Sequence, residues 1–145
     1  SKVRRLNTPL AIAMLDIDNF KKLNDSLGHA AGDAALRHLA VVARECLRPQ
    51  DTMARYGGEE FLVLLPDTTL ERGVDAVGRL QRELAQRPFP GGAAEQGDVA
   101  LVHITFSAGV SQMMGKESPE EAFRRADEGM YRAKRAGKNR VVGSW

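Results

Sequence analysis

The chain lacks the features that hold together small secreted proteins and proteins that span membranes. Cys46 is the only cysteine, which excludes a disulfide within the chain and favours a reducing compartment such as the cytoplasm. No apolar run approaches the roughly 20 residues of a membrane-spanning helix, and no signal peptide is visible. We therefore expect a cytoplasmic domain without membrane contact of its own, and the sequence leaves open whether a parent protein is membrane-anchored.

An excess of charge of either sign is also lacking. The 21 Lys and Arg residues nearly balance the 19 Asp and Glu residues, and the two signs are interleaved along the chain. Because nucleic-acid binding needs a concentrated basic face, we expect no nucleic-acid partner, whereas a small polyanion is compatible with this balance. The 145 residues, 43% of them hydrophobic, fit one domain, and the abrupt basic segment Ser1–Pro9 predicts a fragment of a longer protein.

Apolar periodicity predicts an α+β fold with a mixed, largely antiparallel central sheet flanked by helices, in the order βααββαβαβ. The sheet cannot be all parallel, because two of its strands are joined by a short hairpin. The expected strands are Leu10–Leu15, Thr52–Arg55, Phe61–Leu65, a strand around His103–Phe106, and Arg140–Val142. The expected helices are Phe20–Leu27, a helix from Gly32 that Pro49 ends, a helix with Thr68 and Glu71 as its capping box, and a helix from Ser118 to Gly137.

Glycine-rich segments carry three further local predictions. Pro88–Asp98 is rich in Gly and Pro and is expected to be a loop. Gly109 indicates a bulge or bend in its strand. Gly57 and Gly58 are adjacent at the hairpin turn, which predicts positive φ angles there.

Two neighbouring carboxylates, Glu59 and Glu60, follow the hairpin glycines, and a third, Asp16, ends the first strand. In a solvated turn such acids would only discourage edge-to-edge pairing of sheets. If the first strand lies beside the hairpin, however, Asp16 and Glu59 become neighbours, and paired carboxylates suit Mg²⁺, which takes oxygen ligands. A helix-capping role for acids at strand ends stays open.

Residue spacing disfavours two other kinds of metal site. Asp16–Asp18 begins like an EF-hand loop, but Phe20 and Lys21 occupy its fifth and sixth positions and Leu27 replaces the bidentate glutamate. Zinc is not expected, because Cys46 and the three histidines show no ligand spacing.

Lysines at both ends of the chain could supply charge for phosphate binding. No Walker A sequence is present, but Asp18–Lys21 begins a short helix whose free amide groups can receive phosphate oxygens. Lys21 and Lys22 add charge there, and Lys134 and Lys138 bracket Gly137, where Lys138 could point back toward the same place. Ordinary solvated charge is the alternative for each of them.

Asn24 and Asp33 carry the groups needed to read the Watson–Crick edge of guanine. Asparagine donates and accepts while aspartate only accepts, which matches the N–H donors and the carbonyl of guanine, whereas adenine would leave one group unpaired. The structural alternatives are that Asn24 caps a turn and that Asp33 is the N-cap of the second helix.

The ordered set of these motifs resembles the GGDEF family, the diguanylate cyclases, along almost the whole chain. The matching segments are Asp16–Asp25, Gly28–His29, Gly32–Asp33, the GGEEF hairpin at 57–61, Tyr131–Lys134 and Gly137–Asn139. The resemblance implies one GGDEF domain over residues 1–145, with a palm-like core related to nucleotide cyclases and polymerases. The family's upstream D-x-L-T-x-L-x-N-R element and sensory domain are absent from this sequence, which implies a fragment of a longer sensor protein.

The same resemblance implies a metal site and a catalytic base. Mg²⁺ or Mn²⁺ would be held by Asp16, the Ile17 carbonyl and Glu59, with Glu60 as an additional ligand. Glu59 would also accept the proton of the 3′-hydroxyl group, and Glu60 and Lys21 complete the implied catalytic set.

Substrate and product have separate implied sites. The residues assigned to the GTP substrate are Asn24, His29, Asp33, Lys21, Lys134 and Lys138. Asparagine and aspartate would contact guanine, and the lysines would contact the triphosphate. Arg48-Pro49-Gln50-Asp51 fits the R-x-x-D inhibitory site of product-inhibited members, and Arg79 lies where a supporting arginine is found. Arginine can grip phosphate or a guanine edge with its planar fork.

The implied reaction joins two GTP molecules into cyclic di-GMP with loss of two pyrophosphates. It requires a homodimer with two facing sites, and its product would inhibit through the R-x-x-D site. Two other functions stay open: a non-catalytic receptor for GTP or cyclic di-GMP, and a cyclase that acts on a single purine nucleotide. The intact GGEEF sequence with Asp16 and Lys21 disfavours a receptor, which has no need of paired metal carboxylates.

Overall fold

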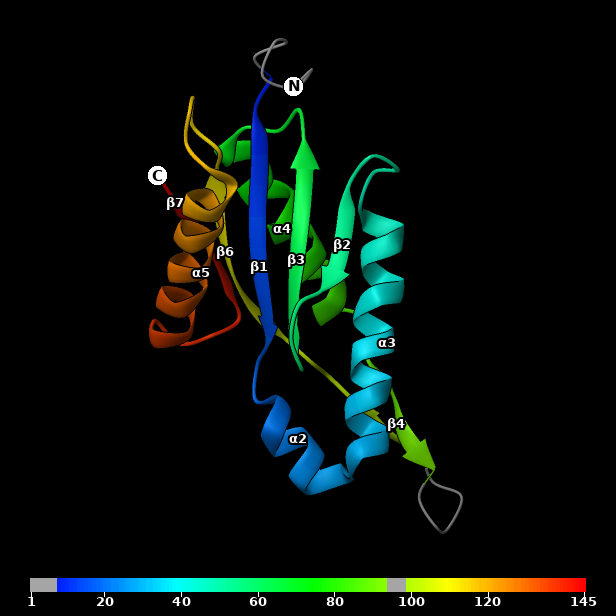
Figure 1. Cartoon of the computed structure of the whole chain (residues 1–145). Coiled ribbons are helices and arrows are strands. Elements are labelled where there is room, and N and C mark those ends of the chain that lie inside the picture. Colours follow the sequence, from blue (N-terminus) through cyan, green and yellow to red (C-terminus); the bar gives the residue numbers. More distant parts are fainter. Residues whose placement is uncertain (1–7, 94–98) are drawn as a thin grey trace.

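The computed structural model describes residues 8–93 and 99–145, which form a five-stranded sheet, a two-stranded sheet and four helices (Figure 1). The strands are β1 Leu10–Ile17, β2 Thr52–Arg55, β3 Glu60–Pro66, β4 Phe89–Ala93, β5 Val99–Val102, β6 Phe106–Gln112 and β7 Arg140–Ser144. The helices are α2 Phe20–Leu27, α3 His29–Cys46, α4 Leu70–Ala85 and α5 Pro119–Arg135. Within the described residues, no helix has both the length and the apolar character to cross a membrane.

The larger sheet has the strand order β2-β3-β1-β6-β7, with β1 at its centre. Strand β1 pairs antiparallel with β3 and with β6, and β2 pairs antiparallel with β3, whereas β6 and β7 are parallel. The predicted mixed, largely antiparallel sheet with flanking helices is therefore confirmed.

Alternation along β1 divides the core into two layers. Ala11, Ala13 and Leu15 belong to the larger cluster, which also includes buried residues of α3 and α4. Ile12 and Met14 point to the opposite face and pack with apolar residues of α5. Because both faces of β1 are covered, the strand reads as a continuous apolar run, and its two ends are the places where polar groups can collect.

Two predicted helix starts are wrong by a short distance. Helix α3 begins at His29 rather than Gly32, because Gly28 at φ 89° ends α2 and starts α3 with no intervening loop. Helix α4 has Thr69, not Thr68, as its N-cap, with the Thr69 hydroxyl accepting from the Arg72 N–H at 3.3 Å.

The loop predicted for 88–98 is wrong over its first part. Phe89–Ala93 pairs antiparallel with Val99–Val102, with an irregular register between Pro90 and Ala93, and residues 94–98 lie outside the described part of the chain. Phe89 is buried and stacks on His38 of α3 with 4.7 Å between ring centroids, so packing overrides the local loop preference. The strand expected around His103–Phe106 is wrong at its centre, because residues 103–105 lie in no strand and separate β5 from β6.

The bulge predicted at Gly109 is also absent. The register runs without a shift through Gly109, both against Met14 of β1 and against Val142 of β7. Glycine is required there because α5 crosses the strand closely: an added Cβ would lie 2.0 Å from the carbonyl oxygen of Ala126. The residue marks a helix–sheet contact and not a bend.

Candidate functional site

The acidic residues of β1 and of the β2–β3 hairpin meet at one edge of the sheet. Asp16 lies opposite Glu60 in the β1–β3 register, and the Ile17 N–H donates to the Glu59 carbonyl oxygen at 3.2 Å. Helix α2 begins three residues beyond Ile17, and the C-terminal end of α5 lies at the same end of β1 (Figure 1). The fold thus brings together two carboxylate-bearing segments that are about 40 residues apart in sequence.

Asp16 has one satisfied and one unsatisfied carboxylate oxygen. The residue is 3% exposed, and its Oδ2 accepts from Nζ of Lys134 on α5 at 2.5 Å. Its Oδ1 is buried and has no hydrogen-bond partner among the described residues. Burial raises the pKa of Asp16, and Lys134 opposes that rise. A buried oxygen of this kind calls for a donor or a cation.

Glu59 and Glu60 lie in the same electrostatic environment. Burial, followed by the negative charge of Asp16, raises the pKa of each. An added cation would relieve that repulsion, and oxygen donors suit Mg²⁺ or Mn²⁺. The described residues contain no ready-made cluster of three or more metal-binding side chains, so the glutamates and Asp16 are adjacent without converging on one point.

The raised pKa values of Glu59 and Glu60 predict that removing the two charges stabilises the fold, by an amount that depends on pH. With no divalent cation present, the Glu59→Gln/Glu60→Gln variant should be more stable than the wild type at pH 7, because each folded-state carboxylate resists ionisation. The difference should shrink as the pH falls toward the ordinary glutamate pKa of about 4.3, where the wild type also becomes protonated. Urea unfolding at several pH values measures this, with Glu128→Gln at an exposed position of α5 as the control. A difference that grew as the pH fell would contradict the account.

The hairpin turn is closed by hydrogen bonds and not by the predicted positive φ angles. Neither Gly57 nor Gly58 adopts a left-handed φ. Instead, the N–H groups of Tyr56 and Gly57 both donate to the Glu60 carbonyl oxygen, at 2.8 and 3.3 Å. The Arg55 guanidinium donates to the Gly57 and Gly58 carbonyl oxygens at 3.1 and 2.7 Å, a contact that the sequence analysis missed. An added Cβ at Gly58 would meet nothing within 4 Å, so the turn leaves its backbone open to an incoming group.

Three lysines surround this edge of the sheet. Lys134 contacts Asp16, Lys138 donates to Oδ1 of Asn19 at 2.6 Å, and Lys21 is exposed in the first turn of α2. The N-terminus of an eight-residue helix and two ammonium groups from the other end of the chain therefore lie beside the carboxylates. Such a combination can bind a phosphate group.

Asn24 lies against α3, next to the position of Asp33. A Cβ on Gly32 would lie 1.9 Å from Oδ1 of Asn24, and this buried oxygen has no hydrogen-bond partner among the described residues. Asp33 is exposed inside α3, so it is not the N-cap that the structural alternative required, and His29 is exposed at the start of that helix. Gly32 provides room for the asparagine side chain, a role that its sequence position alone does not reveal.

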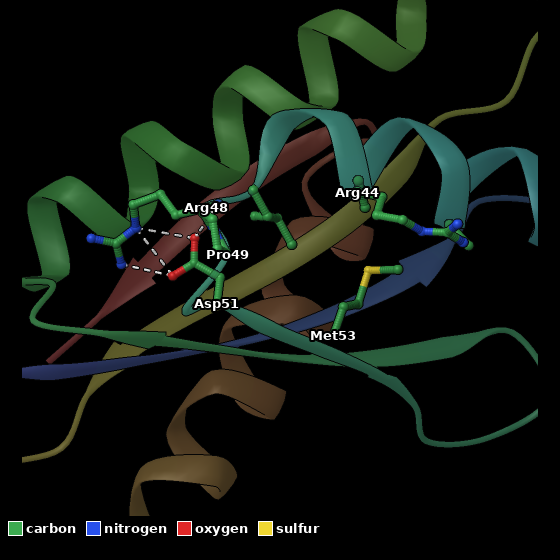
Figure 2. Close-up of a pocket in the computed structure, with 8 residues that line it drawn as sticks. Arg44, Arg48, Pro49, Asp51 and Met53 are labelled. Carbon is green, nitrogen blue, oxygen red and sulfur yellow. Dashed lines mark hydrogen bonds and ion pairs between the residues drawn. The ribbon is translucent and has the colours of Figure 1, made fainter.

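Arg48 and Asp51 form a closed pair on the loop between α3 and β2 (Figure 2). The guanidinium donates to both carboxylate oxygens, with a shortest distance of 2.7 Å, and the Arg48 N–H donates to Oδ2 of Asp51 at 2.8 Å. The Asp51 side chain is only 2% exposed. One cavity beside this pair is lined by Arg44 and Met53 among others.

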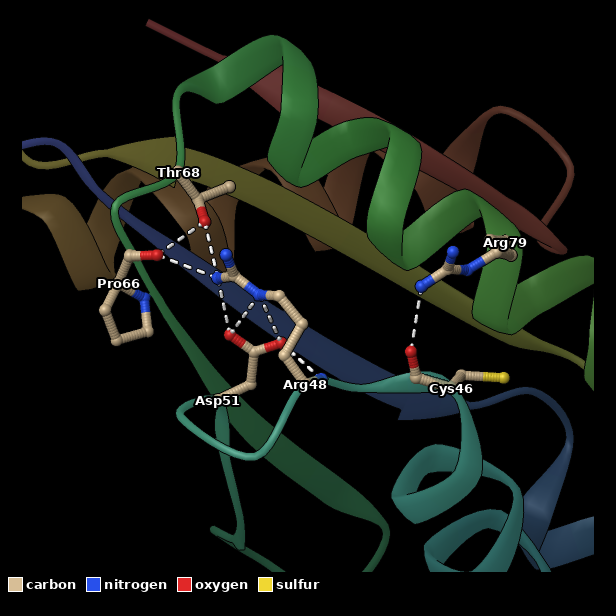
Figure 3. Close-up of polar contacts among 6 residues, drawn as sticks. All are labelled: Cys46, Arg48, Asp51, Pro66, Thr68 and Arg79. Atoms are coloured by element: carbon tan, nitrogen blue, oxygen red, sulfur yellow. Dashed lines mark hydrogen bonds and ion pairs between the residues drawn. The ribbon is translucent and has the colours of Figure 1, made fainter.

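A network of carbonyl groups and a hydroxyl group fixes the predicted inhibitory arginines (Figure 3). Nη2 of Arg48 also donates to the Pro66 carbonyl oxygen at 2.7 Å and to the Thr68 hydroxyl at 2.9 Å. Nη2 of Arg79 donates to the Cys46 carbonyl oxygen at 2.8 Å. Arg48, Asp51 and Arg79 line a common cavity, so the fold brings the three predicted residues together, with the carboxylate already engaged.

Comparison with known proteins gives matches over nearly the whole chain. The family model for the diguanylate cyclase GGDEF domain matches residues 1–140. The diguanylate cyclase DgcP of Pseudomonas aeruginosa is 47% identical over 132 residues, which are 91% of this chain and 19% of that protein. The response regulator PleD of Caulobacter vibrioides is 40% identical over 136 residues, 93% of this chain and 29% of that protein. The chain thus spans less than a third of either relative.

Solved structures share the same architecture. The GGDEF domain of DgcB from Caulobacter crescentus, in complex with c-di-GMP, has a TM-score of 0.87 at 32% identity, covering 98% of this chain and 81% of that chain. The active GGEEF domain of a diguanylate cyclase from Vibrio cholerae has a TM-score of 0.86 at 34% identity, covering 99% and 88%. Both TM-scores show that these domains share the overall fold of this chain.

Proposed function

The chain belongs to the GGDEF family of diguanylate cyclases, and on that premise we propose that it joins two GTP molecules into cyclic di-GMP with release of two pyrophosphates. The observation that carries the proposal is Oδ1 of buried Asp16, which has no hydrogen-bond partner in the described part of the chain and lies beside the GGEEF hairpin and Lys134. A buried carboxylate oxygen that lacks a donor is costly in a purely structural role and fits a cation ligand.

The acidic residues would form the metal-binding and proton-accepting half of the site. Asp16, the Ile17 carbonyl, Glu59 and Glu60 would hold Mg²⁺ or Mn²⁺, since both ions accept carboxylate and carbonyl oxygens. When bound, the ion neutralises triphosphate charge and helps to ionise the 3′-hydroxyl group. Glu59 would accept the proton of that hydroxyl.

The basic residues and the α2–α3 segment would bind the nucleotide. Lys134 neutralises Asp16, and its ammonium group would be free to contact the triphosphate if a cation took over that role. Lys21 and Lys138 would add charge at the N-terminus of α2. Guanine would be read by two side chains of the α2–α3 segment, Asn24 and Asp33, with His29 as a further substrate contact.

A homodimer follows from the proposed chemistry, because each domain would hold one of the two GTP molecules. Incubation with GTP and Mg²⁺, with product identification by mass spectrometry, tests the function. We expect cyclic di-GMP and pyrophosphate, with turnover per molecule rising as the protein is made more concentrated. Formation of cyclic GMP would instead indicate a single-nucleotide cyclase, and bound but unchanged GTP would indicate a receptor.

Product inhibition would act through Arg48, Asp51 and Arg79, and Arg48→Ala should relieve it. We expect the cyclic di-GMP concentration for half-inhibition to rise by about tenfold or more, since a bidentate charged contact is lost. The initial rate in the absence of product should match the wild type. Because Asp51 is left buried without its guanidinium partner, and keeps only the backbone N–H of residue 48 among the described residues, the variant should also lose about 1–3 kcal/mol of stability, and Arg48→Ala/Asp51→Ala should recover part of this loss. Unchanged sensitivity to product would remove the inhibitory-site assignment.

A further inference from the structure

A buried carboxylate outside the proposed metal site joins three distant segments. Asp18 follows β1 and is 8% exposed. Its Oδ1 accepts from the Ser107 hydroxyl at 2.6 Å, and its Oδ2 accepts from the Thr105 hydroxyl at 2.6 Å and from the Asn139 N–H at 2.9 Å. The carboxylate therefore ties the β1–α2 turn to the start of β6 and to the α5–β7 turn. Both of its oxygens accept hydrogen bonds, whereas Oδ1 of Asp16 has no partner among the described residues.

The α5–β7 turn held by Asp18 has an unfavourable backbone conformation. Lys138 and Asn139 are consecutive non-glycine residues in the left-handed region, with φ angles of 66° and 49°. Such conformations persist where surrounding contacts fix them. Besides the bond to Asp18, the Gln81 side chain donates to Oδ1 of Asn139 at 2.8 Å, and the Lys138 N–H donates to the Ala133 carbonyl oxygen at 3.0 Å.

This turn places Lys138 beside the N-terminus of α2. The Lys138 ammonium donates to Oδ1 of Asn19, which is itself at φ 57° immediately before the helix. Asp18 is next to both partners of that contact. Asn19 follows Asp18 in sequence, and Asn139, which follows Lys138, donates its N–H to the Asp18 carboxylate. The ammonium group and the free helix amides are thereby held as one unit.

We infer that Asp18 is a positioning residue for the triphosphate: it does not touch GTP, and it keeps Lys138 and the α2 N-terminus at a fixed separation. The inference rests on the proposed function. Loss of one donor to Asp18 would loosen both turns, so it should weaken the contacts to phosphate and leave the contacts to guanine, at Asn24 and Asp33, unchanged.

Two serines of β6 provide a matched comparison. Ser107 and Ser111 are both completely buried, and each donates one 2.6 Å hydrogen bond, Ser107 to Asp18 and Ser111 to the Ala122 carbonyl oxygen. Isothermal titration with a non-hydrolysable GTP analogue and Mg²⁺, and separately with GMP, should distinguish them. We expect Ser107→Ala to weaken analogue binding by about tenfold and GMP binding by less than about twofold, because a charge-assisted bond is lost. Ser111→Ala should change neither affinity.

Thr105 supplies a second pair of variants that separates positioning from simple loss of folding. Thr105→Val removes the hydroxyl and keeps the branched shape, so it should weaken binding of the GTP analogue. Thr105→Ser keeps the hydroxyl and should bind the analogue as the wild type does. Equal losses in Ser107→Ala and Ser111→Ala, or equal losses for the analogue and GMP, would overturn the positioning role alone. A wild-type protein that failed to bind the analogue would overturn the proposed function as well.

Discussion

Replacement of Glu59 by glutamine is expected to reduce cyclic di-GMP formation by about 10³-fold or more while the fold stays intact. The amide has nearly the shape of the carboxylate, but it neither accepts the 3′-hydroxyl proton nor offers a charged oxygen to a cation. The structure also gives a reason to expect that this substitution does not destabilise the fold. Burial and Asp16 already disfavour the ionised form of Glu59, so the neutral side chain removes a repulsion.

Product formation at saturating GTP measures the effect, and thermal unfolding of the same preparation reports on the fold. Glu128→Gln, an exposed position of α5 that removes the same charge, is the control and should retain wild-type turnover. If Glu59→Gln kept more than about a tenth of the wild-type rate, the proposed base and metal ligand would be wrong, since loss of a positioned base typically costs 10²- to 10⁴-fold.

The largest expected effect on stability comes from Gly109→Ala. The added Cβ would lie 2.0 Å from the Ala126 carbonyl oxygen, 2.2 Å from the Met130 nitrogen and 2.6 Å from the Gly129 carbonyl carbon. All three are backbone atoms, so a side-chain rotation cannot relieve the clash and α5 must move away from β6. We expect a loss of about 3 kcal/mol or more, at the upper end of overpacking effects.

The same substitution should also impair activity, because α5 carries Lys134 to Asp16. Chemical denaturation measures the loss in free energy of unfolding. Gly58→Ala is the stability control, since a Cβ there meets nothing within 4 Å. That control should change the unfolding free energy by less than about 0.5 kcal/mol, as for surface substitutions in general. Similar stabilities for the two variants would show that α5 does not approach the sheet as closely as described.

The strands and helices that the sequence predicted correctly are those whose apolar residues repeat with a clear period. Leu10–Leu15 reads as a doubly covered strand because both of its faces are buried, and the Ser118–Gly137 region reads as a helix because its caps and its apolar spacing agree. The placement of Asp16 near the hairpin was predicted only on the condition that the first strand lies beside the hairpin, and the pairing of β1 with β3 meets that condition. Local patterns of this kind are visible in a single sequence because each is contained within a few consecutive residues.

The features that the sequence missed depend on contacts between distant residues. Gly109 and Gly32 leave room for Ala126 and Asn24, respectively, and nothing near either glycine in sequence indicates that neighbour. Asp18 receives donors from 87, 89 and 121 residues further along the chain. The β4–β5 pairing likewise depends on burial of an aromatic ring against α3, which outweighs the local preference of glycine and proline for loops.

The predicted inhibitory motif shows a further limit of sequence patterns. The family resemblance implied that Arg48 and Asp51 bind the product, and the structure pairs the two side chains with each other. A ligand at this site must therefore exchange those hydrogen bonds for its own, and part of its interaction energy replaces bonds already present.

We propose that Asp16 and Glu59 share a divalent cation beneath bound GTP. Anomalous diffraction from Mn²⁺, in crystals of the protein grown with a non-hydrolysable GTP analogue, tests this arrangement. We expect an anomalous peak coordinated by Asp16 and Glu59 oxygens, with the Lys134 ammonium moved from Asp16 to the triphosphate. A metal held by the nucleotide and water alone, with Lys134 still paired to Asp16, would contradict it.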